Sequence, residues 1–293
     1  LEHMQREIDD AVREALDRAL ANGGMEVIDE LALYLPSQMI CRIIGIPEAD
    51  RLRFTDWTAA RTNAFFAAFL PEEVKDNVRA AGEGMADYFE DLVKDRRQHM
   101  GEDLLSELIR AEEDGDRLDA DELIVQVIGL LVAGFETTIG LIGNGIRTLV
   151  NHPAQLHRLQ NNLGLLDNAV EECLRFDPPV LFNWRILTES YEIGGKTLPS
   201  DSVLWMMLGA GNRDPMKFNK PDEFDIGRKN PQHLSFGGGT HFCLGHQLAR
   251  MEARTALGEF ARRIKNPEII ESEVEWSMSF FRVLGRLPIS VSK

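Results

Sequence analysis

The sequence has 293 residues, 44% of them hydrophobic and 8% aromatic, which is enough to bury a sizeable core and excludes a disordered chain. Its 48 acidic and 32 basic residues give a net charge of −16, which disfavours nucleic acid and anionic membranes as general partners. Three scattered cysteines, Cys41, Cys173 and Cys243, form no disulfide framework, so we expect a soluble protein of the reducing cytoplasm. The longest apolar run, near 124–135, is too short for a membrane span and predicts a buried core helix.

Hydrophobic periodicity predicts a series of helices over the first 180 residues. The first covers about 1–21, with an apolar stripe that includes Ile8, Val12 and Leu16, and it ends at a Gly-Gly pair. Its first residues already fit the stripe, which indicates that the sequence begins inside a structural element. The next helices are expected within 31–46, after a short β-prone piece, and at 49–70, 72–99, 103–113, 120–151, from 153 onward, and at 168–176.

Local signals refine this helical half. The helix at 49–70 carries an aromatic face: Trp57, Phe65, Phe66 and Phe69. An Asp-Gly-Asp turn at 114–116 ends the helix before it. Asp119 or Asp121 is expected to cap the central helix, whose middle is apolar on all sides, so this helix should cross the core.

The second half of the sequence has a different pattern. From 182 to 205 it contains short β-like segments, with a turn at Gly194-Gly195. Residues 209–233 are irregular and rich in Asn, Asp, Pro and Gly, and a further helix follows them. The stretch 275–291 alternates weakly, which predicts a terminal hairpin. The predicted fold class is therefore mainly α, with a small β portion toward the C-terminus.

A glycine-rich loop with one cysteine, Phe236 to Gly245, reads FGGGTHFCLG and is followed at once by the last helical pattern. At the start of a helix, a thiolate is stabilised by the helix dipole and by backbone amides that have no helical acceptor. Glycines allow a large flat ligand to approach the backbone closely because they carry no Cβ. The residue types therefore favour Cys243 as a soft anionic ligand to a metal.

This loop has three other interpretations. A lone cysteine is most often a small buried hydrophobic residue. A phosphate-binding loop would need a Lys-Ser/Thr pair after the glycines, and none follows. His241, Cys243 and His246 could suggest a zinc site. Such a site would need a second ligand pair at usable spacing, and none follows in the sequence.

The whole string resembles the heme-ligating signature of the cytochrome P450 family, Phe-Gly-x-Gly-x-His-x-Cys-x-Gly. Every fixed position is matched: Phe236, Gly237, Gly239, His241, Cys243 and Gly245. The resemblance implies that Cys243 ligates the iron of heme b, iron protoporphyrin IX, and that the other matched residues, among them Phe236, Gly237, His241 and Gly245, surround the cofactor. Family members extend further at the N-terminus, so we expect one P450 domain over 1–293 that lacks the leading β-sheet and first helices.

The central helix carries the string Ala-Gly-Phe-Glu-Thr-Thr at 133–138. A carboxylate in a buried helix is costly unless it is paired, hydrated or functional, and a threonine hydroxyl bonded to the carbonyl one turn back can bend a helix. These residues alone fit either a structural kink or a functional site. The string resembles the family's oxygen-activation motif, which implies that Thr137 and Glu136 deliver protons and that Ala133 lies beside the heme.

Other segments resemble family motifs with structural or binding roles. Glu172 and Arg175, three apart on a predicted helix, resemble the family's Glu-x-x-Arg motif, which would pair with Arg228 and lock the cysteine loop. Arg185 resembles an arginine that binds one heme propionate, and His241 would serve the other. Substrate contacts are expected from apolar residues and one polar anchor: Leu130, Val180, Leu181, Phe182, Phe280 and Asn183.

The resemblance implies a heme-thiolate monooxygenase that inserts one oxygen atom from O2 into a small hydrophobic substrate, with electrons from a separate ferredoxin- or flavodoxin-type donor. Two other functions stay open. A peroxide-driven peroxygenase would use the same cofactor, although Glu136 and Thr137 argue against it because peroxide brings its own protons and electrons. An inactive, N-terminally truncated remnant that binds heme, or does not, is the third.

Overall fold

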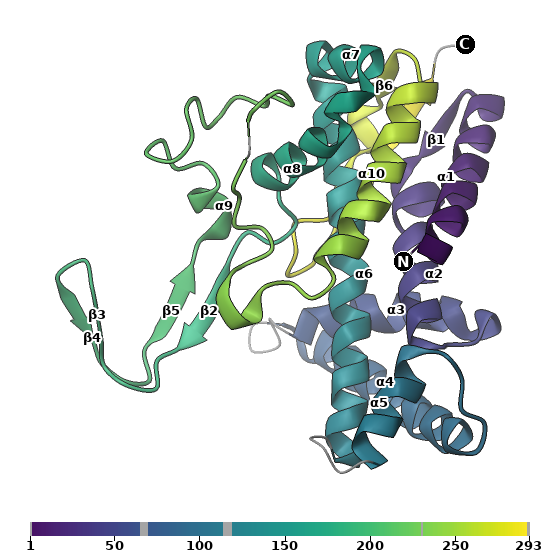
Figure 1. Cartoon of the computed structure of the whole chain (residues 1–293), viewed down its shortest axis with the longest axis vertical. Helices are drawn as coiled ribbons and strands as arrows, with labels where there is room; N and C mark the ends of the chain where they lie inside the picture. The colour runs from purple at the N-terminus through teal and green to yellow at the C-terminus, as the bar shows by residue number, and fades with distance from the viewer. Residues whose placement is uncertain (1, 65–69, 114–118, 230, 292–293) are drawn as a thin grey trace.

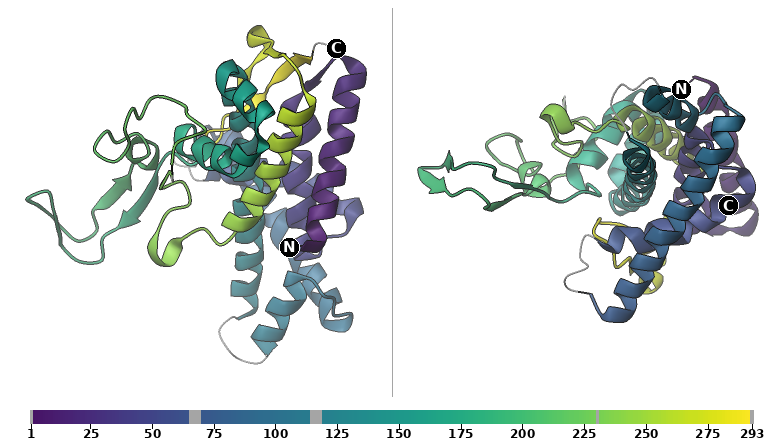
Figure 2. Two further views of the ribbon diagram at one scale, coloured as in Figure 1. Left: turned by 45° about the horizontal axis from the view of Figure 1, so that its top comes forward. Right: turned by 90° about the horizontal axis from the view of Figure 1, so that it is seen from below.

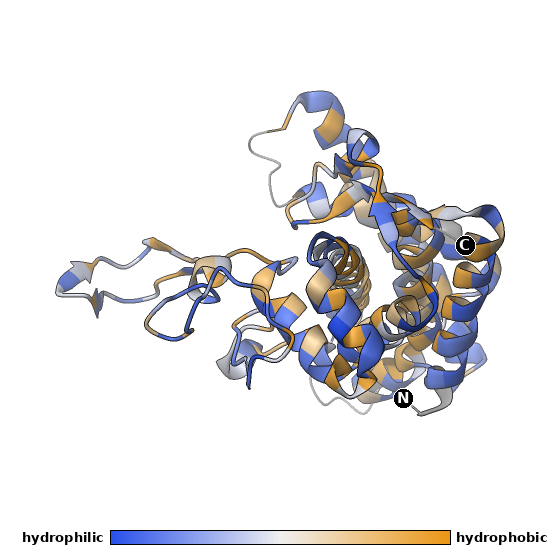
Figure 3. Cartoon of the chain, turned by 90° about the horizontal axis from the view of Figure 1, so that it is seen from above, coloured by the Kyte–Doolittle hydropathy of each residue, from blue (hydrophilic) through white to orange (hydrophobic). Residues whose placement is uncertain are grey.

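The computed structural model describes residues 2–64, 70–113, 119–229 and 231–291. Within them the chain is mainly helical with small sheets, as the periodicity predicts. Two long helices, α6 (Ala120–Asn151) and α10 (His246–Arg263), pack together at the centre, and α1 (Glu2–Asn22) lies against α10 (Figure 1). Hydrophobic residues lie where these helices face one another, whereas outward faces are mostly polar (Figure 3).

The remaining helices surround this pair. They are α2 (Tyr34–Ile44), α3 (Arg51–Thr62), α4 (Glu72–Gln98), α5 (Leu104–Glu113), α7 (Pro153–Asn161), α8 (Leu166–Phe176) and the one-turn α9 (Leu208–Gly211). Each of them except α9 packs on α6. The predicted boundaries of α1, α4 and α8 agree with the structure to within a few residues, because Pro and Gly punctuate the chain there.

Two predicted helices differ from the observed ones. The stretch expected as one helix within 31–46 is split into a π-helical turn, Ile28–Ala32, followed by α2. The helix expected at 49–70 begins with a short 3₁₀ turn, Glu48–Asp50, and its α-helical part ends at Thr62. Three residues of its predicted aromatic face (Phe65, Phe66 and Phe69) and the turn at 114–116 lie outside the described residues.

Helix α6 begins with a capping box. The Asp119 side chain accepts a hydrogen bond from the Glu122 backbone N–H (2.8 Å), and the Glu122 carboxylate accepts one from the Asp119 N–H (3.1 Å). Of the two predicted caps, Asp119 is therefore the right one. The second half of the helix is buried on nearly every side, as expected, but Gly129 and Ala133 in its middle are exposed. The prediction that the helix is enclosed all round is wrong for this stretch.

The apolar segment is also longer than the sequence pattern indicated. Helix α6 has 32 residues and is long and apolar enough, by length and composition, to cross a membrane. The prediction that this run is too short for a span is therefore wrong. Nevertheless, 44% of its most apolar window is buried inside the protein, and neighbouring helices pack along it. Such burial is typical of a core helix.

A three-stranded antiparallel sheet joins the two ends of the chain. Its order is β1 (Gly24–Glu26), β9 (Pro288–Val291) and β6 (Pro267–Ile269), with Ile289 opposite both Met25 and Ile269. The predicted terminal hairpin exists as the short pair β7 (Glu275–Trp276) and β8 (Leu284–Arg286). However, the last strand leaves that hairpin and pairs with the sheet instead, which the weak alternation did not predict.

The predicted β-rich segment forms an arm that projects from the helical body (Figures 1 and 2). Strand β2 (Asn183–Ile186) pairs with β5 (Val203–Met206), and the tip is the hairpin of β3 (Tyr191–Ile193) and β4 (Lys196–Leu198). The turn at that tip consists of Gly194 and Gly195, whose φ angles of 59° and 73° require glycine. The arm carries Arg185 and Asn183 next to the helices.

Candidate active site

The cysteine loop connects the irregular segment to α10. Its glycines adopt left-handed φ angles, 69° at Gly237 and 65° at Gly239, and the Cys243 backbone N–H donates to the Phe236 carbonyl (3.0 Å), which closes the loop. Cys243 itself stands three residues before the first residue of α10. Its side chain is half-buried, whereas Cys41 and Cys173 are buried. The sequence therefore presents one accessible thiol, at the position where a helix begins.

The charge state of this thiol differs in part from the expectation. Burial raises the pKa of Cys243, while a hydrogen bond from the Gly245 backbone and the positive charge of Arg250 lower it, and burial has the larger effect. The predicted help from the start of the helix is thus present but is outweighed by desolvation. A thiolate at Cys243 needs a further positive charge, such as a bound metal ion, to become the dominant form.

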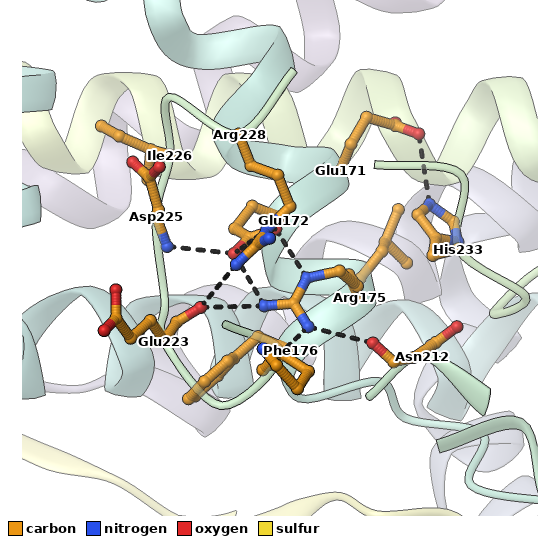
Figure 4. Close-up of polar contacts among 12 residues, drawn as sticks. Glu171, Glu172, Arg175, Phe176, Asn212, Glu223, Asp225, Ile226, Arg228 and His233 are labelled. Atoms are coloured by element: carbon orange, nitrogen blue, oxygen red, sulfur yellow. Dashed lines mark hydrogen bonds and ion pairs between the residues drawn. The ribbon is translucent and has the colours of Figure 1, made fainter. Parts of the chain in front are cut away.

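The loop is preceded by an ionic cluster on α8. Glu172 and Arg175 are both fully buried, and the Arg175 Nε and Nη2 atoms donate to the two Glu172 carboxylate oxygens at 2.8 Å each (Figure 4). The Nε of Arg228 approaches the same carboxylate at 3.1 and 3.2 Å. The structure therefore brings together the three residues that the sequence grouped, and it is Arg175 that binds the Glu172 carboxylate in a bidentate manner.

The two guanidinium groups also fasten the irregular segment that leads to the cysteine. Arg175 donates to the backbone carbonyls of Asn212, Pro221 and Glu223 at 2.8–3.0 Å. Arg228 donates in turn to carbonyls at 219, 220 and 223. Backbone carbonyls in an irregular segment have no hydrogen-bond donors from a helix or a sheet. The bonds from Arg175 and Arg228 take the place of those backbone hydrogen bonds.

A second cluster, which sequence reasoning missed, holds the first residues of the cysteine loop. The carboxylate of Glu171, next to Glu172 on α8, accepts hydrogen bonds from Arg250 of α10 (2.6 and 3.0 Å) and lies 3.2 Å from the His233 ring (Figure 4). Burial opposes the charge of Glu171, but His233 and Arg250 together lower its pKa to about 2. Arg250 also stacks over the Phe236 ring at 4.5 Å. The only signal in the sequence was the doubled acid, Glu171-Glu172.

The polar residues of the central helix make hydrogen bonds within the protein. The Thr137 hydroxyl donates to the Ala133 carbonyl one turn back (2.8 Å), and the helix stays α-helical from end to end. Glu136 is buried with 7% of its surface exposed, and it accepts a hydrogen bond from the Ser279 hydroxyl at 2.8 Å. Burial raises the pKa of Glu136, and hydrogen bonds from Ser279 and Thr62 oppose this shift.

Several residues expected to contact substrate form an aromatic cluster. The ring of Phe280 packs on Phe182 at 5.0 Å and on Trp184 at 5.5 Å, and both of these rings pack on Trp205 of strand β5. Val180 and Leu130 are half-buried, and Leu181 is 38% exposed. The sequence did not single out Trp184 and Trp205, although Trp184 lies between two polar residues of its strand.

The predicted polar anchor is already engaged within its own strand. The Asn183 side-chain oxygen accepts hydrogen bonds from the Trp184 backbone N–H (2.8 Å) and from Arg185 (3.3 Å). Arg185 also donates to the Trp184 carbonyl (2.8 Å). Among the described residues, no carboxylate forms an ion pair with Arg185, so its guanidinium remains available to an anionic group.

Comparison with known proteins decides the family. Residues 50–266 match the family described as Cytochrome P450. The chain belongs to the cytochrome P450 family. It is 37% identical over 293 residues to cytochrome P450 107B1 of Saccharopolyspora erythraea, covering 99% of this chain and 70% of that P450. It is also 37% identical to 6-deoxyerythronolide B hydroxylase of the same organism, covering 99% and 71% of the two chains.

Solved P450 structures show the same fold. One is P450BioI in complex with an acyl carrier protein ligated to hexadec-9Z-enoic acid. It superposes with a TM-score of 0.92 at 35% identity, over 99% of this chain and 75% of that one. Because the P450 family implies a heme cofactor, the site can be tested for its fit to a porphyrin.

The chemistry of the site suits a heme. Among the described residues, no group of three or more His, Cys, Asp or Glu side chains could hold a metal ion, so a metal here needs ligands from outside the protein. A porphyrin would supply four nitrogen ligands, and the accessible Cys243 sulfur would supply a ligand from the protein. A side-chain carbon added at Gly129, Gly238 or Gly245 would meet nothing within 4 Å, so backbone on α6 and on the loop is open to a flat ligand.

Exposed apolar side chains point to the same conclusion. Phe242 and Leu244, on either side of Cys243, are 46% and 83% exposed. Exposure of such apolar surface to water is unfavourable, and a bound macrocycle would reduce the exposed area. The guanidinium of Arg185 and the exposed ring of His241 are available to the two propionates of heme. The residues present therefore fit the group that the P450 family implies.

Proposed function

We propose that this chain is a heme-thiolate monooxygenase that inserts one oxygen atom from O2 into a small hydrophobic substrate. The observation that carries the proposal is the single accessible thiol of Cys243, presented at the start of α10 on a loop that a buried and a half-buried ion cluster hold in place. Its family membership and the hydroxylase among its relatives support the same reaction class.

In this proposal heme b binds through Cys243, with Arg185 and His241 at its propionates and Phe236, Gly237, Gly245 and Ala133 around it. When bound, the heme supplies the iron at which O2 is activated. The protein's part is to hold the Cys243 sulfur on a loop that ion clusters anchor.

Proton supply falls to the central helix. Glu136 is buried and its pKa is raised, so it holds a proton more readily than a surface carboxyl and can release it to a neighbouring acceptor. Thr137, the next residue, exposes a hydroxyl whose hydrogen points to the Ala133 carbonyl and whose lone pairs are free to accept. The pair suits a reaction that consumes protons, which favours O2 over peroxide as the oxidant.

The substrate would be apolar. The aromatic cluster of Phe182, Trp184, Trp205 and Phe280 offers ring faces with one nearby polar group, Asn183. In the complex of P450BioI, the carrier protein bears hexadec-9Z-enoic acid, a fatty chain of the same apolar character. We further propose that the enzyme is cytoplasmic and receives electrons from a ferredoxin- or flavodoxin-type donor.

The thiolate assignment is tested by the reduced carbon monoxide complex of the heme-loaded chain. We expect the Soret band at the position that only thiolate-ligated heme shows. The variant Cys243→Ser should lose this band, whereas Cys41→Ala, which alters a buried cysteine on α2, should keep it. A band typical of nitrogen-ligated heme, or one that Cys243→Ser leaves in place, would refute the assignment.

The reaction is tested with isotopically labelled O2. Turnover of a hydrophobic substrate that causes a spin-state change should place one labelled oxygen atom in the product, with a reductase and ferredoxin supplying electrons. Faster turnover with hydrogen peroxide than with reductant and O2 would assign the chain to peroxygenase chemistry instead.

A further inference from the structure

Glu136 is held by neutral hydroxyl groups. Among the described residues, no ionised side chain pairs with it, and the causes of its raised pKa are burial and hydrogen bonds from Ser279 and Thr62. A buried acid that must release and regain a proton repeatedly needs a path to water. Among the described residues, Ser279 and Thr62 are the hydroxyl groups named as hydrogen-bond partners of Glu136, so each can be examined as the first step of such a path.

The two hydroxyls have different surroundings. Thr62 is fully buried at the end of α3, and its hydroxyl donates its one hydrogen to the carbonyl of Thr58 at 2.9 Å, although Thr62 is also among the hydrogen-bonding groups that lower the pKa of Glu136. Both of these neighbours lie in the interior, so Thr62 leads away from water. It can orient the carboxyl group of Glu136 but offers no route by which a proton could enter from water.

Ser279 lies at the edge of the solvent. It is half-buried in the loop between β7 and β8, and the adjacent Met278 is 85% exposed. Its oxygen accepts a hydrogen bond from the Phe281 backbone N–H (3.1 Å), which directs its own hydrogen to Glu136 at 2.8 Å. A hydroxyl has two lone pairs, so one remains to accept a hydrogen bond from water.

We propose that the hydroxyl of Ser279 is the inlet through which Glu136 regains its proton from solvent, and that Thr62 is a positioning residue for the same carboxyl group. In the transfer, the Ser279 O–H bond breaks as an O–H bond forms on Glu136. The serine oxygen takes a proton from solvent hydronium, which is left as water, so that charge and atoms balance. The role in turnover rests on the proposed function.

The first test needs no turnover. The carboxyl C=O band of protonated Glu136 is isolated as the infrared difference between the wild-type chain and Glu136→Gln and is followed with pH. Since the Ser279 hydrogen bond lowers the pKa, Ser279→Ala should shift the titration of this band to higher pH. Ser279→Thr, which keeps a hydroxyl, should restore it. Thr58→Val, a buried hydroxyl on α3 without a partner, is the matched control and should leave the band unchanged.

The second test separates an inlet from a positioning role. Thr62→Val should also shift the titration upward, because it removes the other hydrogen bond. In the heme-loaded enzyme, only Ser279→Ala should then increase the solvent deuterium isotope effect on kcat. It should also lower kcat by up to about 100-fold, the lower end of what positioned proton transfer contributes, with KM unchanged. Equal isotope effects for Ser279→Ala and Thr62→Val would overturn the inlet, as would a titration that Ser279→Ala does not move.

The two proposals fail in different ways. A chain that forms no thiolate-type carbon monoxide complex and no product refutes the proposed function. In that case the infrared titration alone decides whether Ser279 controls the proton on Glu136. Normal turnover combined with an unmoved titration refutes only the inlet.

Discussion

Arg175 shows how one side chain organises a segment without regular structure. A guanidinium has five N–H donors, and all five of Arg175 are used: two on the Glu172 carboxylate and three on backbone carbonyls. Because the side chain is fully buried, none of these bonds competes with water. The pair with Glu172 therefore acts on the fold of the loop, at a distance from the reacting atoms.

Arg175→Met should consequently destabilise the protein strongly. The change leaves the buried carboxylate of Glu172 with Arg228 as its one charged partner among the described residues, beside the Asp225 backbone N–H, and leaves three backbone carbonyls without this donor. We expect it to cost about 3–5 kcal/mol of unfolding free energy. The matched control is Arg158→Met, which removes an exposed ion pair with Asp225 (2.8 Å) and should cost no more than about 1 kcal/mol. Urea unfolding measures both, and similar losses for the two variants would contradict the structural role of Arg175.

Glu252 is a buried acid for which the proposed reaction has no use. It lies on α10 with 1% of its surface exposed, its Oε2 has no hydrogen-bond partner, and burial raises its pKa to about 8 from a usual value of 4.5. The folded state therefore keeps this proton at pH values where the unfolded chain has lost it. By linkage, the contribution of Glu252 to stability falls as pH rises from about 4.5 to about 8.

Glu252→Gln should remove the loss of stability that Glu252 causes as pH rises. The variant should gain stability relative to the wild type as pH rises from 5 toward 8, because glutamine keeps the shape and carries no charge at any pH. Thermal unfolding at several pH values gives the slopes. Glu259→Gln, half-buried on the same helix and paired with Arg262, is the control and should keep the wild-type slope. A Glu252→Gln slope equal to that of the wild type would show that Glu252 is ionised in the folded protein.

At the scale of the element, α6 combines two surfaces that a periodicity plot does not separate. Most of its residues are apolar, yet Leu141, Ile142 and Ile146 are buried between helices while Gly129 and Ala133 are exposed. Hydrophobic patterning reports which residues avoid water but cannot distinguish a protein neighbour from a flat cofactor. The prediction that this helix crosses the core fails at Gly129 and Ala133, which are exposed.

This open face gives a test of where the cofactor lies. Ala133→Phe places a ring in open space, so the fold should tolerate it, but the ring would occupy the space that the heme needs. We expect heme incorporation to fall at least about tenfold, which corresponds to about 1.4 kcal/mol of binding free energy. Val125→Phe, on the same helix at a position that is 66% exposed, is the control. Pyridine hemochromogen measurements give the stoichiometry, and equal incorporation by the two variants would place the cofactor elsewhere.

The parts of the structure that could be predicted from sequence are those with local causes. Capping at Asp119, a Gly-Gly turn at the tip of the arm, and the spacing of Glu172 and Arg175 are all set within a few residues. The contacts that were missed join distant parts of the chain. Ser279 meets Glu136 across 143 positions, and no local pattern marks either as a partner of the other.

The same limit applies to the cysteine loop. Its residues stood out because they match a family signature, whereas the anchoring of the loop by Glu171, His233 and Arg250 depends on how α8 and α10 pack. Helix packing is decided by the shape of whole faces, so it does not appear in the spacing of single residues. The π-helical turn at Ile28–Ala32 was missed for a related reason, because neighbouring helices determine it more than its own residues do.

At the scale of the whole molecule, the first and last segments of the described chain are joined. Strand β9 lies between β1 and β6, and the Val291 backbone N–H also donates to the Gly23 carbonyl (3.0 Å), directly after α1. Helix α1 packs in turn on α10, whose first residues follow the cysteine loop. A disturbance in β9 can therefore reach the site through packed elements, provided that the chain folds as the single domain that the sequence predicts.

Ile289→Ala tests this dependence. Ile289 is buried with 2% of its surface exposed, in register with Met25 and Ile269, and its truncation should cost about 2–5 kcal/mol of unfolding free energy. If the described chain unfolds as one unit, circular dichroism of the helices and tryptophan fluorescence, to which Trp184 and Trp205 of the arm contribute, should give one shared midpoint, shifted equally by the variant. Ser290→Ala, the next residue and half-exposed, should change stability by no more than about 0.5 kcal/mol. A shift of the helical signal alone would show that the arm and the helices unfold separately, because only a shared core transmits the loss at β9 to both.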